Sequence, residues 1–121
     1  MSYLRREHHQ QRGTAAEQLA LDHLLGQGLT LVARNYRCRM GEIDLVMRDA
    51  DTTVFVEVRL RGRSAFASAA ESIDARKQGR IIAAAHHYLM GKPDQPCRFD
   101  CVLLSRLDPG GIEWLRAAFT L

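Results

Sequence analysis

Two short charged segments would meet on a β-hairpin, and their side chains are of the kinds that bind metal ions and phosphate. Glu42 and Asp44 alternate with apolar residues in the first segment, and Glu57 and Arg59 do so in the second. If the chain reverses at residues 50–51, antiparallel pairing places Asp44 opposite Glu57 and Glu42 opposite Arg59, with all four side chains on one face. Directly opposed Cβ atoms are roughly 4.5–5.5 Å apart, and like charges there repel. The pattern therefore predicts a cation, or ample water, between the two carboxylates.

Mg²⁺ meets this requirement, because it binds through one or two carboxylates and keeps water molecules for a substrate phosphate. The alternative is a solvated strand face on which Glu42 and Arg59 form a cross-strand ion pair. The spacing of these residues leaves both interpretations open.

Glu17 and Lys77 lie on helical segments and raise the same question. Thr14 and Glu17 have the S/T-x-x-E spacing of a capping box, which would explain Glu17 as part of a helix start. Glu17 also shares a helical stripe with Leu24, and a carboxylate on the side that faces a sheet needs a partner or a cation. Lys77 lies at the spacing of the apolar Ile81, so its stem either snorkels from the edge of the core or reaches into the site.

A mixed sheet with helices packed against it must position these residues. Hydrophobic periodicity predicts a helix from Thr14 to the glycines at 26 and 28, strands over 29–36, 42–47, 54–61, 98–105 and 112–119, and a second helix over 70–90. The order is α-β-β-β-α-β-β. Residues 1–13 show no periodicity and are predicted to form a flexible arm, with 14–121 as a single domain.

The composition is that of an ordinary globular domain. The 121 residues are 46% hydrophobic and 26% charged, which suits one domain with a core of its own. Three cysteines cannot make a complete set of disulfides, and the first residues lack a secretory leader, so we expect a reducing, cytoplasmic location. No apolar run approaches the ~20 residues that cross a bilayer, which argues against membrane insertion.

The basic residues favour a nucleic-acid partner. The net charge is only +3, but nearly all the cations are arginines, whose planar guanidinium groups suit phosphate. They occur in groups: Arg34, Arg37 and Arg39; Arg59, Arg61 and Arg63; and Arg76 and Arg80 beside Lys77. A solvated arginine-rich surface is the competing explanation.

The motifs resemble those of the YraN family, small bacterial proteins similar to archaeal Holliday junction resolvases. The resemblance runs from about residue 13 to 104 and rests on Gly13-x-x-Ala16-Glu17, Ala33-Arg34-Asn35-Tyr36-Arg37-Cys38-Arg39-x-Gly41-Glu42-Ile43-Asp44-Leu45, Phe55-Val56-Glu57-Val58-Arg59-x-Arg61, Ala70-x-Ser72-Ile73-Asp74-x-x-Lys77 and Arg98-Phe99-Asp100. It implies a restriction-endonuclease-like fold with a PD-(D/E)XK type of active site. Asp44 then matches the Asp of the motif, Glu57 its D/E, and Glu17 the helix Glu of resolvase relatives.

Arg59 departs from that motif, which has lysine at this position. Arginine stays protonated at any accessible pH, so Arg59 cannot act as a general base, although it can neutralise a phosphate. Three interpretations follow. Arg59 acts through its charge alone, Lys77 takes the place of the motif lysine, or hydrolysis has been lost.

Together these patterns predict a nucleic-acid-binding protein that hydrolyses DNA phosphodiester bonds with Mg²⁺ or Mn²⁺, with branched or damaged DNA as a candidate substrate. Asp44 and Glu57 would hold the metal with support from Glu17, and Arg59 or Lys77 would stabilise the phosphate. The predicted backbone contacts are Arg34, Arg37, Arg39, Arg61 and Arg63. The alternatives are a catalytically inactive module for branched or damaged DNA and a protein-interaction subunit. Resolvase relatives pair to cut two strands, so a homodimer stays open beside a monomer.

Other candidate residues favour structural roles. Four-residue spacing of Cys97 and Cys101 on a strand is not typical of a zinc site, and His86 and His87 point about 100° apart on a helix. Asp100 is predicted to have a structural role, pairing with Arg98 or a helix end, and the single tryptophan, Trp114, is predicted to belong to the core rather than to stack on bases.

Overall fold

The computed structural model describes the backbone of residues 2–60 and 73–120 and the side chains of 13–60 and 73–120. Five strands form one mixed sheet in the order β1-β2-β3-β4-β5. The elements are α1 (Ser2–Gly26), β1 (Thr30–Cys38), β2 (Gly41–Asp49), β3 (Thr52–Leu60), α3 (Ala75–Leu89), β4 (Cys97–Leu104), a 3-10 turn (Pro109–Gly111) and β5 (Ile112–Phe119). The predicted α/β class and element order are confirmed for the described residues.

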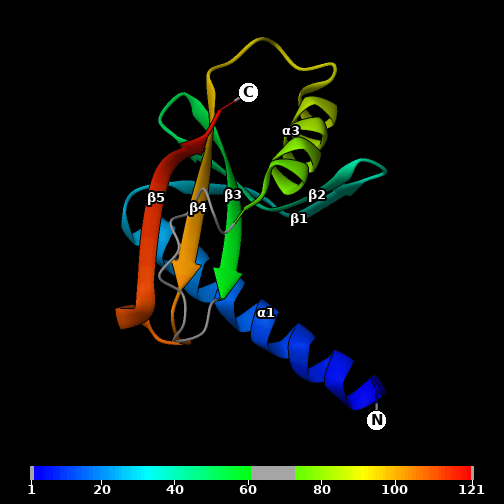
Figure 1. Ribbon diagram of the computed structural model, residues 1–121. Helices are drawn as coiled ribbons and strands as arrows, with labels where there is room; N and C mark the ends of the chain where they lie inside the picture. The colour runs from blue at the N-terminus through cyan, green and yellow to red at the C-terminus, as the bar shows by residue number, and fades with distance from the viewer. Residues whose placement is uncertain (1, 61–72, 121) are drawn as a thin grey trace.

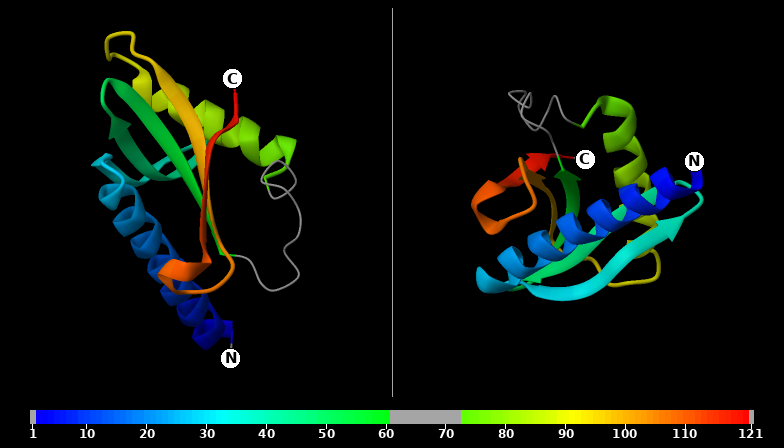
Figure 2. Two further views of the ribbon diagram at one scale, coloured as in Figure 1. Left: turned by 90° about the vertical axis from the view of Figure 1, so that its left-hand side faces the viewer. Right: turned by 90° about the horizontal axis from the view of Figure 1, so that it is seen from below.

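The two helices cover opposite faces of the sheet (Figures 1 and 2). Strands β1, β2 and β3 are joined by antiparallel pairing, β3 and β4 are parallel, and β5 returns antiparallel to β4. Because β3 and β4 are parallel, the chain must cross over between them, and α3 lies on that crossover. The β1–β2 hairpin extends beyond β3 and passes under α3 (Figure 1).

Alternation along β3 builds a core on each face. Val54 and Val56 face α1 and pack with residues such as Leu24, whereas Phe55 faces α3 and packs with residues such as Ile81. A strand covered on both faces is nearly continuous in apolar residues, and β3 has this composition up to Val56. Glu57 interrupts it as a buried charge on the α3 face. This break in the apolar pattern marks the start of the candidate site.

The helix boundaries correct two predictions. Helix α1 begins at Ser2, so Thr14 lies inside it, and the predicted helix start and capping box at Thr14 are wrong. The helix takes in residues 2–13, which were predicted to form a flexible arm. Helix α3 begins at Ala75 because the Asp74 carboxylate accepts a hydrogen bond from the backbone N–H of Lys77 at 2.8 Å, which is an N-cap. The predicted start at residue 70 lies outside the described residues. None of the described helices combines the length and apolar character needed to span a membrane.

Asp100 has the structural role predicted for it. It is fully buried in β4 and accepts hydrogen bonds from Arg98 Nε, from the Trp114 indole N–H at 3.0 Å and from the backbone N–H of Ala117 at 3.0 Å. These bonds tie β5 to β4 where their register shifts. Trp114 packs against the α1-side core, so the prediction that it is a core residue is also confirmed.

Candidate functional site

The site forms where β2 and β3 separate. The predicted hairpin register is confirmed from Asp49 paired with Thr52 to Leu45 paired with Val56, which is the last pair between these strands in the described chain. One position further on, the Asp44 carboxylate accepts a hydrogen bond from the backbone N–H of Val58 at 2.8 Å. A side chain therefore satisfies a β3 donor that the ladder no longer pairs. Asp44 lies in the resulting gap and not in a regular opposed pair with Glu57.

Asn35 marks a switch of face in the β1–β2 hairpin. Arg34 pairs with Leu45 and Tyr36 with Ile43, so Asn35 and Asp44 lie opposite each other between these pairs. Leu45 belongs to the α1-side core and Ile43 to the α3-side core, which strict alternation would not allow. Asn35 has φ of 52°, a left-handed conformation that asparagine tolerates better than most residues. The hairpin therefore rotates at Asn35, and Asp44 is turned toward the gap.

This rotation corrects the prediction that four charged residues share one face. Glu42 lies on the α1 side, where its carboxylate is 3.2 Å from Arg37 Nε. Arg59 Nε instead lies 3.7 Å from the Glu57 carboxylate on the α3 side. The predicted ion pair between Glu42 and Arg59 is therefore wrong, because β2 has left β3 before Glu42 is reached.

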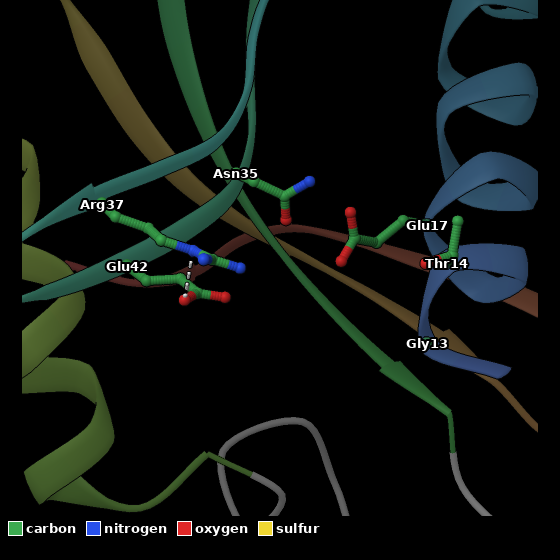
Figure 3. A pocket seen from close by; sticks show the side chains of 6 residues that line it. All are labelled: Gly13, Thr14, Glu17, Asn35, Arg37 and Glu42. Carbon is green, nitrogen blue, oxygen red and sulfur yellow. Dashed lines mark ion pairs between the residues drawn. The ribbon is translucent and has the colours of Figure 1, made fainter. Parts of the chain in front are cut away.

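On the α1 side, an open cleft of about 340 Å³ lies between α1 and the hairpin (Figure 3). Glu17 points from α1 into this cleft toward Asn35, with Arg37 and Glu42 on the opposite wall (Figure 3). Burial raises the pKa of Glu17, and so does the charge of Asp44, whereas hydrogen bonding by Asn35 opposes the rise. Since Thr14 is not a helix start, the capping interpretation of Glu17 fails and the sheet-facing one holds.

On the α3 side, Glu57 is buried among charged groups. It is 5% exposed, and its Oε1 lies 3.7 Å from both Lys77 Nζ and Arg59 Nε. Burial and then the charge of Asp44 raise the pKa of Glu57 to about 7, although both cations act in the opposite direction. Lys77 thus reaches the site from α3, while its neighbour Arg76 is exposed, as the helical spacing predicts.

Asp44 links the two sides. Burial raises its pKa, the charge of Glu42 adds to the rise, and the hydrogen bond from Val58 opposes it. Its charge in turn raises the pKa of both Glu17 and Glu57. Three carboxylates from α1, β2 and β3 thus hold their protons more tightly than free side chains do, chiefly because burial disfavours the charged form, and the charge of Asp44 adds to this for Glu17 and Glu57.

These carboxylates suit a hard divalent cation that keeps much of its water. No group of three or more His, Cys, Asp or Glu side chains within residues 13–60 and 73–120 is arranged to enclose a metal ion. Mg²⁺ does not need such a cage, since one or two carboxylates and water molecules suffice. The mutual repulsion of Asp44 and Glu57 in a buried setting is the feature that a cation would relieve, and these two residues fit the role.

The predicted phosphate contacts are only partly described. Arg34 donates to the Gln18 side chain of α1 at 3.0 Å and so links the two walls of the cleft, whereas Arg37 pairs with Glu42 within the hairpin wall. Arg39 is exposed at the hairpin turn. Arg61 and Arg63 lie outside the described residues.

Asn35 is the site residue that motif spacing does not reveal. Asparagine is depleted in strands and enriched in left-handed conformations, so its place between Arg34 and Tyr36 in a predicted strand was a usable signal. The bond from the backbone of Val58 to Asp44 has no such signal. Alternation predicts a continuous ladder at that point.

Comparison with known proteins agrees with the motif resemblance. The model of the uncharacterised protein family UPF0102 matches residues 16–104. A UPF0102 protein of Methylobacillus flagellatus is 53% identical over 110 residues, which cover 91% of this chain and 97% of the relative. One from Nitrosomonas europaea is 56% identical over 109 residues, or 89% and 92% of the two chains. A third relative, from Pseudomonas entomophila, is 54% identical over 112 residues, which cover 88% of this chain and 91% of the relative. The chain therefore belongs to the UPF0102 (YraN) family.

Proposed function

We propose that this protein binds nucleic acid and hydrolyses DNA phosphodiester bonds with Mg²⁺ or Mn²⁺, on a restriction-endonuclease-like fold. The observation that carries the proposal is the convergence of Asp44 and Glu57 at the gap between β2 and β3, with Lys77 beside them. Paired carboxylates with raised pKa values and an adjacent lysine are a combination typical of phosphoryl-transfer sites. The motif resemblance points to the same chemistry.

Each residue has a role that its position supports. Asp44 and Glu57 would hold the ion, which would supply Lewis-acid polarisation of a phosphate oxygen and activation of water. Lys77 Nζ lies 3.7 Å from Glu57, and Arg59 Nε lies at the same distance, so either cation could neutralise a phosphate bound there. Glu17 points into the cleft on the α1 side, near enough for the charge of Asp44 to raise its pKa, and would accept a hydrogen bond from the attacking water.

A catalytically inactive DNA-binding module is the second candidate, and one observation favours it. Lys77 and Arg59 already surround the Glu57 carboxylate. A site in which two fixed cations replace the metal would bind phosphate without cutting it. The nuclease would need divalent ions to cleave DNA, whereas the inactive module would bind DNA equally well with and without them.

The test is cleavage of labelled linear, single-stranded, flap and four-way-junction DNA in Mg²⁺, in Mn²⁺ and in EDTA. We expect cleavage that requires the metal and is lost in Glu57→Gln. The matched control is Glu113→Gln, which removes an exposed carboxylate on the edge strand β5 and should cut like the wild type.

Two other outcomes have definite meanings. DNA binding without cleavage, equal in metal and in EDTA, would support the inactive module. A wild type that neither cuts nor binds any of these DNAs at low salt would overturn both nucleic-acid functions and favour a protein-interaction role.

A further inference from the structure

The turn of the β1–β2 hairpin is an exposed feature that the proposed active site does not use. Arg39 and Met40 form a two-residue turn between the paired Cys38 and Gly41, and Met40 is 42% exposed. Tight hairpin turns favour Gly, Asn and Asp, so turn geometry does not explain an arginine followed by methionine. An exposed apolar side chain flanked by arginine suggests a contact surface.

Helix α3 holds this turn in place. A Cβ atom on Gly41 would lie 2.7 Å from the Arg80 carbonyl oxygen and 3.2 Å from Arg80 Cβ, so the backbones of the turn and the helix touch. The exposed Arg80 and Arg76, one turn apart on α3, therefore flank the same surface as Arg39. We call Arg39, Met40, Arg76 and Arg80 the hairpin-tip surface.

The three arginines are not held in ion pairs within the described chain. Among the described residues, no salt bridge holds Arg39, Arg76 or Arg80, and Glu42, the acid next to the turn in sequence, pairs with Arg37. The hairpin-tip surface thus presents three exposed arginines around one exposed methionine. Phosphate-binding arginines beside an apolar side chain that inserts at a base step are a combination that nucleic-acid-binding proteins use to recognise distorted duplexes.

We propose that the hairpin-tip surface binds nucleic acid next to the active site, with Arg39, Arg76 and Arg80 on phosphates and Met40 against an unstacked base step. This inference rests on the proposed function and adds a substrate class to it, DNA whose stacking is already interrupted. Met40 and Asp44 are about 13 Å apart along β2, which corresponds to roughly four nucleotides of one strand. The distorted step therefore lies roughly four nucleotides from the phosphate at Asp44.

The test measures binding in EDTA, where no cleavage occurs, to a plain duplex and to the same duplex with a central mismatched bubble. We expect the wild type to bind the bubble duplex more tightly than the plain duplex. In Met40→Ser, the ratio of the Kd for the plain duplex to the Kd for the bubble duplex should fall several-fold. Met40→Leu should keep it, which separates the apolar contact from a folding effect. Met90→Ser is the matched control, because Met90 is 72% exposed at the other end of α3.

The arginines are tested by salt dependence. Arg39→Gln combined with Arg80→Gln should weaken binding to both DNAs and lower the slope of log K against log salt by about 0.9 for each lost phosphate contact. The control pair is Arg48→Gln with Arg116→Gln, which removes exposed arginines on β2 and β5 away from the turn.

The outcomes separate this inference from the proposed function. Suppose that the wild type binds both DNAs, that Met40→Ser and Met90→Ser have the same preference for the bubble duplex, and that the two double variants have equal salt slopes. The proposed role of the hairpin-tip surface is then wrong, and the nuclease proposal stands. If the wild type binds neither DNA at low salt, both fail, and the exposed Met40 becomes a candidate protein contact.

Discussion

The carboxylate of Asp44 and the backbone N–H of Val58 form a 2.8 Å hydrogen bond across the gap between β2 and β3. This bond replaces a rung of the sheet, so Asp44 has a structural role as well as the chemical one proposed for it. The same gap brings Asp44 close enough to Glu57 for the charge of Asp44 to add to the effect of burial and raise the pKa of Glu57 further. Strand separation and the candidate chemistry therefore have a common origin.

Asp44→Asn and Asp44→Ala should differ in stability because of this bond. Asparagine retains an oxygen that accepts from Val58, whereas alanine leaves a buried N–H unpaired, which costs about 1–3 kcal/mol. At pH 8 we expect Asp44→Ala to lower the free energy of unfolding in urea by about that amount. Asp44→Asn should have a free energy of unfolding equal to that of the wild type or higher. Equal losses in both variants would contradict the structural role of the bond.

Glu57 makes stability depend on pH. Its pKa is about 7 in the folded protein against 4.5 in the unfolded chain, so the folded state binds the proton more tightly. Stability should therefore fall as pH rises from about 4.5 to 7, with Glu17 and Asp44 contributing in the same direction. Glu57→Gln should flatten this dependence of stability on pH. At pH 8 its free energy of unfolding should exceed that of the wild type by roughly 1–3 kcal/mol. A variant less stable than wild type at pH 8 would show that the ion pairs with Lys77 and Arg59 outweigh burial.

Divalent ions should stabilise the folded protein at pH 8. An ion that binds only the folded state at 100 times its Kd adds about 2.7 kcal/mol, seen as a higher Tm in a thermal melt. We expect Mn²⁺ to raise the Tm of the wild type and of Glu113→Gln, and to have little effect on Asp44→Asn combined with Glu57→Gln. A shift that survives in the double variant would place the ion elsewhere.

Asn35 should tolerate glycine better than alanine. Its φ of 52° lies in the left-handed region, where a non-glycine residue without a polar side chain is disfavoured by about 1–2 kcal/mol. Both variants lose the amide that bonds Glu17, so the difference between them isolates the backbone. We expect Asn35→Ala to be less stable in urea than Asn35→Gly by about 1 kcal/mol, and identical midpoints would exclude a left-handed backbone at this position.

Gly41 and Gly79 should respond to alanine in opposite directions. A Cβ on Gly41 would meet the Arg80 carbonyl at 2.7 Å, so hairpin and helix must move apart at a cost of about 1–3 kcal/mol. A Cβ on Gly79 meets nothing within 4 Å, and alanine in a helix interior is favoured over glycine by about 1 kcal/mol. In urea denaturation, Gly41→Ala should therefore have a lower free energy of unfolding than the wild type, and Gly79→Ala a higher one.

The sequence by itself determined the order of elements and the residues that meet. Period-two and period-3.6 patterns identified the strands and placed Lys77 on the inner side of its helix, because burial of apolar side chains is read directly from spacing. The turn at residues 50–51 set the register from Asp49 with Thr52 to Leu45 with Val56. Motif identity then singled out Glu17, Asp44 and Glu57 as one site.

Only the tertiary structure decided how these residues face one another. Alternation assumes a flat, continuous ladder, but the hairpin rotates at the left-handed residue Asn35 within β1 and packs at Gly41 on α3, so β2 separates from β3. Glu42 and Arg59 consequently lie on opposite sides of the sheet, and a backbone donor of β3 binds the Asp44 side chain. Such a separation depends on contacts between segments far apart in the chain, which local spacing does not encode. The length of α1 was missed for a different reason, because its first turns lack the apolar period that predicts a helix.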